Sequence, residues 1–88
     1  MAVIAGVVVD ADGVPVPDAR VYVTDGPGPV PDVAALTDPD GRFALSAGAD
    51  GAYTVECRSE RGGASRVTVA TVTVRGGMAA ELRVRLEP

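Results

Sequence analysis

The side chains that most suggest a catalytic or metal-binding role are two pairs of aspartates, each pair followed at once by glycine. They lie in the segments DADG (residues 10–13) and DPDG (residues 38–41). A calcium site needs about six or more oxygen ligands, and neither segment carries the further acids or the distal glutamate of an EF-hand loop. Proline, flanking aspartates and a glycine at positive φ are the composition of a β-turn. We therefore predict two turns, which would form a weak cation site only if they met at one end of the fold.

Other groups that could carry catalysis are scarce. The 88 residues contain no His and no Lys, and Cys57 is the single cysteine. General acid-base catalysis usually relies on His or on a carboxylate whose pKa is shifted by a partner. Cys57 lies on the apolar parity of a predicted strand, where a lone cysteine usually acts as a small apolar filler. We predict no catalytic residue, no metal site, no cofactor and no small-molecule substrate, so we do not expect an enzyme.

Charge and hydropathy exclude two further classes of partner. Twelve acidic and eight basic residues leave a net charge of -4, whereas phosphate binding needs a clustered positive surface. The apolar run over residues 1–9 has no basic start and reaches Asp10 too soon for a signal peptide or a membrane span. We expect no nucleic-acid partner and no membrane insertion. We expect a soluble chain that acts in the cytoplasm, in an assembly or as one domain of a longer protein.

Apolar residues alternate with polar ones along almost the whole chain, which is the period of a β-strand. Strands are predicted up to Asp10 and over residues 19–24, 35–37, 42–46, 53–58, 65–74 and 82–87. The two segments around DPDG are predicted to form a hairpin. In the segment 65–74, Val67 and Val69 share one parity but Val72 and Val74 share the other, so we predict a bulge or a change of sheet near Ala70-Thr71.

No predicted helix is long enough to cover a sheet, so each sheet must bury its apolar face against another sheet. Seven strands joined by turns predict an all-β fold, a seven-stranded antiparallel β-sandwich. The chain shows no internal repeat and no linker, so residues 1–88 are expected to form a single domain.

Three spaced motifs resemble the carboxypeptidase regulatory-like domains. They are I-x-G-x-V-x-D-x-x-G-x-P-x-x-x-A-x-V-x-V from Ile4, T-D-x-x-G-x-F-x-L from Thr37, and G-x-Y-x-V from Gly51. Those domains are transthyretin-like sandwiches close to the Cna-B repeats of bacterial surface proteins. The resemblance implies a Greek-key sandwich used as an accessory, folding-support or interaction module. Asp18 departs from the family, which often has Gly there.

Related folds that carry chemistry lack their residues here. The transthyretin-like hydroxyisourate hydrolases use histidines and a C-terminal Tyr-Arg-Gly-Ser, and Cna-B isopeptides join Lys to Asn. Starch-binding relatives use Trp platforms. The chain has no His, Lys, Asn or Trp and ends in Leu86-Glu87-Pro88. The resemblance therefore implies neither hydrolysis, nor cross-linking, nor carbohydrate binding.

The first strand has an unusual apolar side. If Ile4 and Val8 face the core, then Ala5, Val7 and Val9 face outward, where a solvated sheet normally shows polar residues. Either a loop or the N-terminal residues cover this stripe, or it belongs to the ordinary apolar share of any protein surface, or it is a protein-protein interface.

Two other features are exposed candidates, namely an outward aromatic residue and a proline-rich loop. The candidate contact residues are Ala5, Val7, Val9, Tyr22, Pro27, Pro29 and Pro31. The outward arginines Arg58, Arg83 and Arg85 are expected to form cross-strand pairs with acids such as Glu56 and Glu87.

These residues predict a non-enzymatic module for protein-protein interaction or structural support, which binds a protein partner or itself. One alternative is a structural decoration or adaptor subunit of a phage-like or secretion assembly. A more distant one is a surface domain that binds calcium weakly.

Overall fold

The computed structural model describes residues 2–28, 34–60, 63, 65–76 and 80–86, which form an all-β fold. Its seven strands are β1 (Ala2–Asp10), β2 (Arg20–Asp25), β3 (Ala35–Leu36), β4 (Arg42–Ala47), β5 (Gly51–Ser59), β6 (Arg66–Val74) and β7 (Ala80–Leu86). The predicted number of strands is confirmed. Within the described ranges, no helix has the length and apolar character needed to cross a membrane.

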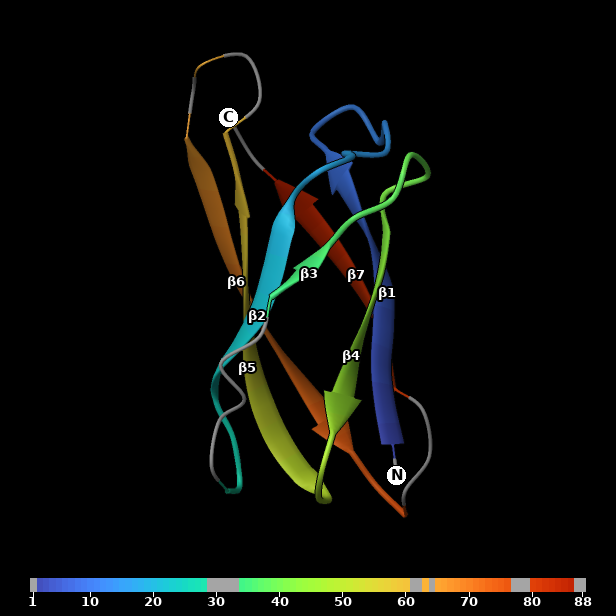
Figure 1. Cartoon of the computed structure of the whole chain (residues 1–88), viewed down its shortest axis with the longest axis vertical. Helices are drawn as coiled ribbons and strands as arrows, with labels where there is room; N and C mark the ends of the chain where they lie inside the picture. Colours follow the sequence, from blue (N-terminus) through green and yellow to red (C-terminus); the bar gives the residue numbers. More distant parts are fainter. Residues whose placement is uncertain (1, 29–33, 61–62, 64, 77–79, 87–88) are drawn as a thin grey trace.

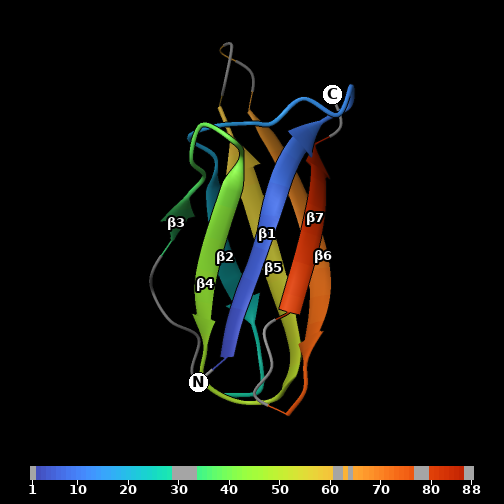
Figure 2. The same cartoon turned by 90° about the vertical axis from the view of Figure 1, so that its right-hand side faces the viewer.

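The strands form two sheets that pack face to face (Figures 1 and 2). One sheet has the order β4-β1-β7 and the other has the order β3-β2-β5-β6. The pairs β1–β4, β2–β3, β2–β5 and β5–β6 are antiparallel, but β7 runs parallel to β1. The expectation of a purely antiparallel sandwich is corrected at this one pair. Parallel neighbours need a long crossover connection. Here the chain forms β2 to β6, which include every strand of the other sheet, before it returns as β7.

Aliphatic side chains fill the space between the sheets, as the alternation predicts. The fully buried ones include Ile4 and Val8 from β1, Val21 from β2 and Val55 from β5. Tyr53 is also buried, and its hydroxyl donates to the Ala49 carbonyl (2.6 Å) and accepts from the Ala49 amide (3.1 Å). The two-layer burial predicted for an all-β chain without a covering helix is confirmed.

The predicted hairpin around DPDG is wrong, because its two flanking strands belong to different sheets. β3 pairs with β2, whereas β4 pairs with β1. The physical cause is Thr37, whose buried hydroxyl donates to the Val16 carbonyl (2.7 Å) and accepts from the Ala19 amide (2.9 Å). These bonds hold the chain against the segment before β2 just where it leaves one sheet for the other.

The predicted bulge or change of sheet in β6 is also wrong. β6 pairs with β5 over nine residues, from Gly51 opposite Val74 to Ser59 opposite Arg66, without a register shift. The regular ladder turns Val67 and Val69 to the solvent, because Val72 and Val74 point inward on the other parity. β6 lies at the edge of its sheet, where exposing two valines costs less than breaking a ladder.

Candidate functional site

The aspartate turns are two copies of one local structure, and their carboxylates hold the backbone. Asp10 Oδ1 accepts from the amides of Asp12 and Val14, both at 2.9 Å. The Gly13 amide then donates to the Asp10 carbonyl (3.0 Å), and Gly13 has φ +82°. This is an Asx turn closed by a glycine in the left-handed region.

The second turn repeats these contacts. Asp38 Oδ1 accepts from the amides of Asp40 and Arg42, again at 2.9 Å, and the Gly41 amide donates to the Asp38 carbonyl at 2.8 Å. Gly41 has φ +76°. The prediction that both DADG and DPDG are turns is therefore confirmed, with Asp10 and Asp38 as the residues that order them.

The two turns lie at the same end of the sandwich (Figure 1). The Val8 amide at the end of β1 donates to the Gly41 carbonyl at 2.8 Å, and Pro15, just after the first turn, packs close to Gly41. Across the described parts of the chain, however, no three Asp, Glu, Cys or His side chains come together as metal ligands. The meeting of the turns thus brings no support for the calcium alternative.

Cys57 lies in the core on β5 and has no exposed surface. Burial raises the pKa of its thiol to about 11, because an apolar environment disfavours the charged thiolate. The thiolate is the reactive form of cysteine, so this residue is poorly suited to act as a nucleophile. Its predicted place among the core residues is confirmed.

Val9, predicted to face outward, is instead buried, with 4% of its surface exposed. After the first turn the chain folds back along β1, so that Pro15 bridges to Val9 and the Val16 amide donates to the Val8 carbonyl (2.9 Å). This segment covers the end of β1. The expected outward position is wrong for Val9, and a covering loop, one of the alternatives given for the stripe, explains it.

Ala5 and Val7 lie on the outer side of the three-stranded sheet, as predicted, but they are only half-exposed. They line a hollow of about 720 Å³, the β1 hollow, together with residues of β1, β4, β7 and the turn before β4, namely Gly6, Asp40, Arg42, Phe43, Glu81, Leu82 and Arg83. Val7 stands between Arg42 on β4 and Arg83 on β7. The long arginine side chains border Val7 on both sides, which accounts for its partial burial.

Gly6 explains how closely β1 fits between its neighbours. A Cβ atom at Gly6 would lie 1.9 Å from the Leu82 carbonyl oxygen and 2.9 Å from Cζ of Phe43. Only glycine allows β7 and the Phe43 ring to approach β1 here. The floor of the β1 hollow is therefore a tightly packed central strand.

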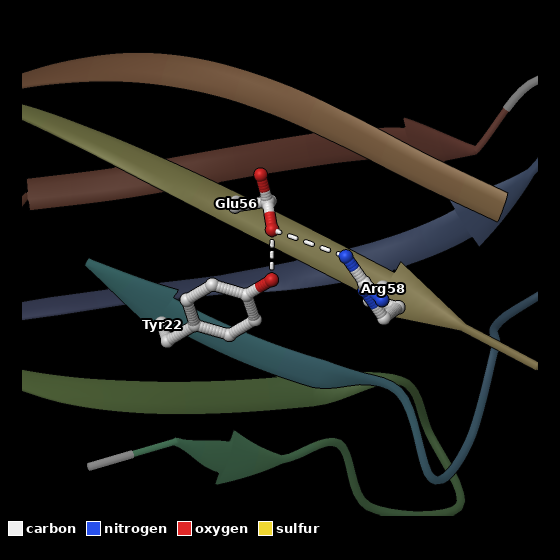
Figure 3. Close-up of polar contacts among 3 residues, drawn as sticks. All are labelled: Tyr22, Glu56 and Arg58. Atoms are coloured by element: carbon white, nitrogen blue, oxygen red, sulfur yellow. Dashed lines mark hydrogen bonds and ion pairs between the residues drawn. The ribbon is translucent and has the colours of Figure 1, made fainter. Parts of the chain in front are cut away.

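Tyr22 lies on the outer side of the other sheet, half-buried against its neighbours (Figure 3). Its hydroxyl donates to Glu56 Oε2 on β5, and an Arg58 guanidinium nitrogen lies 3.9 Å from the same oxygen. Arg58 therefore pairs within its own strand rather than across strands. Directly opposite Arg58 stand Arg20 on β2 and Val67 on β6, which corrects the expected cross-strand pairing at this residue.

Sequence reasoning missed the apolar residues that are most exposed on this side. Leu36, Val67 and Val69 have exposed fractions of 62%, 47% and 58%. The parity change between Val69 and Val72 was the signal that could have found two of them, had a regular strand been assumed. Leu36 has no such signal, because β3 is only two residues long.

The proline loop is described only in part. Pro27 is exposed and lies close to Gly51, where a Cβ atom would be 3.0 Å from Pro27 Cγ. Pro29 and Pro31 lie outside the described residues, as does Glu87. The prediction of a recognition loop rests on the sequence alone.

Comparison with known proteins agrees with the resemblance seen in the sequence. No curated protein sequence matches the chain significantly. The family model of the carboxypeptidase regulatory-like domain, a non-catalytic β-sandwich of the transthyretin-like type, matches residues 3–87. With this match over nearly its whole length, and with the two-sheet fold described above, the chain belongs to the carboxypeptidase regulatory-like domain family.

Proposed function

We propose that this domain is a non-enzymatic protein-interaction module that contacts its partner through the β1 hollow. The observation that supports this is the composition of the hollow. Its floor is apolar at Ala5 and Val7, while Asp40 and Arg42 on one side and Glu81 and Arg83 on the other bring charges of both signs. An apolar centre within a polar, charged rim is the usual anatomy of a protein interface.

The strand under the hollow is also suited to binding. β1 is paired on both sides, to β4 and to β7, and Gly6 holds these neighbours close. A contact surface on such a strand is ordered before the partner arrives. Binding to it therefore loses little conformational entropy, which favours affinity.

The groups that looked most like catalysts serve the fold, which supports a non-enzymatic role. The Asp10 and Asp38 carboxylates accept backbone amides within their turns, and burial raises the pKa of Cys57. A structural adaptor subunit is the second candidate. This candidate differs from the interaction module in what fills the β1 hollow, which would be a second copy of the chain.

The test compares wild-type protein with a Val7→Asp variant. Val7 is half-buried and stands between two arginines, so the variant should still fold, which circular dichroism checks. Thr71→Asp, an exposed position on the other sheet, is the matched control. We expect wild-type and Thr71→Asp proteins to capture the same partner from lysate of the source cell, and Val7→Asp to lose it.

Light scattering over a range of concentrations separates the two occupants. Concentration-dependent association that Val7→Asp abolishes identifies a second copy and hence the structural subunit, whereas a monomer that captures another protein identifies the interaction module. Capture of the same partner by folded Val7→Asp would overturn the assignment of the β1 hollow. A monomer that captures nothing would overturn the interaction role.

A further inference from the structure

The first and last strands of the fold, β1 and β7, lie side by side and run in the same direction (Figure 2). Their register is unbroken over seven residue pairs, from Ile4 opposite Ala80 to Asp10 opposite Leu86. The chain therefore enters the fold at one end of this ladder and leaves it at the other. The domain measures 37 Å along its longest axis, and the start of β1 and the end of β7 lie towards opposite ends of that axis (Figure 1).

This arrangement determines how a pulling force acts on the β1–β7 ladder. A force between the two ends runs along both strands, so the evenly spaced hydrogen bonds of the parallel ladder are strained together. If the same strands were pulled apart from one end, the bonds would break one after another. Forced unfolding is governed by the unfolding rate. Bonds that must break together therefore resist a force more strongly than bonds that break in turn.

The β1–β7 ladder is also shielded from water. On its inner side, Ile4 and Val8 of β1 and Val84 and Leu86 of β7 are buried in the core. On its outer side, Val7 is half-buried. A strained hydrogen bond is exchanged for a bond to water only where water can reach it, and an inaccessible bond is costly to leave unmade. Burial of the ladder therefore adds to its resistance.

Two contacts brace β7 near the end where the chain leaves the domain. The Arg85 guanidinium donates to the Ala11 carbonyl in the first turn. The Thr68 hydroxyl on β6 donates to the Arg85 carbonyl at 3.2 Å. The end of β7 is thus held both to the turn that follows β1 and to the other sheet. These contacts oppose the peeling of β7 before the whole ladder is loaded.

We infer that this domain is a load-bearing module, which keeps its fold when the chain is under tension between its two ends. The β1–β7 ladder is the clamp that resists the force, and the domain transmits tension as a rod 37 Å long. The inference concerns the backbone ladder and the direction of the force. It does not depend on the function proposed for the β1 hollow.

Single-molecule force spectroscopy tests this inference by pulling the same two strands in two directions. In one protein, handles are attached at Val3→Cys on β1 and at a cysteine added after Pro88, which loads the ladder along its length. In the other protein, they are attached at Val3→Cys and Glu81→Cys, which lie at the same end of the ladder and pull the strands apart sideways. Val3 and Glu81 are exposed, whereas Cys57 is buried and takes no handle.

At equal loading rates, we expect the end-to-end unfolding force to be at least about threefold the sideways force, because seven residue pairs share the load. End-to-end unfolding should occur in a single step, since no strand is released before the ladder breaks. Chemical denaturation without load should give the two proteins the same midpoint, so that the difference in force reflects direction alone. Equal forces in the two directions, or end-to-end unfolding in several steps that begin at the sideways force, would overturn the inference.

Discussion

Strands β1 and β6 both carry apolar residues on their two sides, yet the fold treats them in opposite ways. In β1 the outward Val9 is covered by the returning chain at Pro15, and Val7 is bordered by two arginines. In β6 the outward Val67 and Val69 stay open to solvent. β1 is the central strand of its sheet, whereas β6 lies at an edge. Apart from Val3, which is 37% exposed, the outward valines of the central strand are shielded, whereas those of the edge strand are open.

The difference between β1 and β6 depends first on the hydrogen bonds that hold the segment after the first turn over the end of β1. Thr37→Val keeps the side-chain shape but leaves the buried Val16 carbonyl and Ala19 amide without the hydroxyl. We expect a loss of about 3 kcal/mol of unfolding free energy, because two buried polar groups lose their partner. Chemical denaturation measures the loss.

The matched control for Thr37→Val is Thr68→Val on β6. There the hydroxyl donates to the Arg85 carbonyl at 3.2 Å in an exposed setting. Removing that bond should cost less than about 1 kcal/mol, because water can replace it. Equal losses of unfolding free energy in the two variants would mean that the buried hydrogen bonds of Thr37 stabilise the fold no more than the exposed hydrogen bond of Thr68.

The second pair replaces valine by threonine on each strand. Val9→Thr places a hydroxyl at a buried position and should lower the unfolding free energy by about 2 kcal/mol. Val69→Thr changes an exposed side chain to one of similar shape and strand propensity, so its effect should stay within about 0.5 kcal/mol. A Val9→Thr protein as stable as Val69→Thr would show that Val9 is not covered.

Much of this fold follows from local patterns. The alternation of apolar and polar residues predicted the strands and the core position of Cys57. The residue types in DADG and DPDG predicted that both segments form turns. Each of these depends on neighbours within a few residues. That is why a single sequence sufficed for them.

The errors arose where distant segments decide the outcome. The chain changes sheet at Thr37 because of contacts with Val16 and Ala19, which the spacing around DPDG does not reveal. Val9 is buried because the chain after the first turn returns along β1. Of the predicted contact residues, Ala5 and Val7 line one hollow while Tyr22 lies on the opposite sheet, so the structure does not bring them together.

The smallest expected effect concerns the end of the segment that covers β1. Asp18 has φ +59°, in the left-handed region that disfavours residues with a Cβ atom. Asp18→Gly, the residue common in the family, should raise the unfolding free energy by about 0.5–1 kcal/mol. Asp12→Gly is the control, since Asp12 is exposed without a positive φ and should lose stability slightly. Destabilisation by both would contradict the strain assigned to Asp18.

The outward valines of β6 are open to solvent, whereas Val9 at the end of β1 is covered. Thiol labelling of Val69→Cys and Val9→Cys proteins, resolved by mass spectrometry, tests this difference directly, with the buried Cys57 as internal reference. We expect the thiol at position 69 to react as fast as in an unfolded peptide. The thiol at position 9 should react more than about a hundredfold slower, only when the fold opens. Equal rates at the two positions, or faster labelling at position 9, would contradict it.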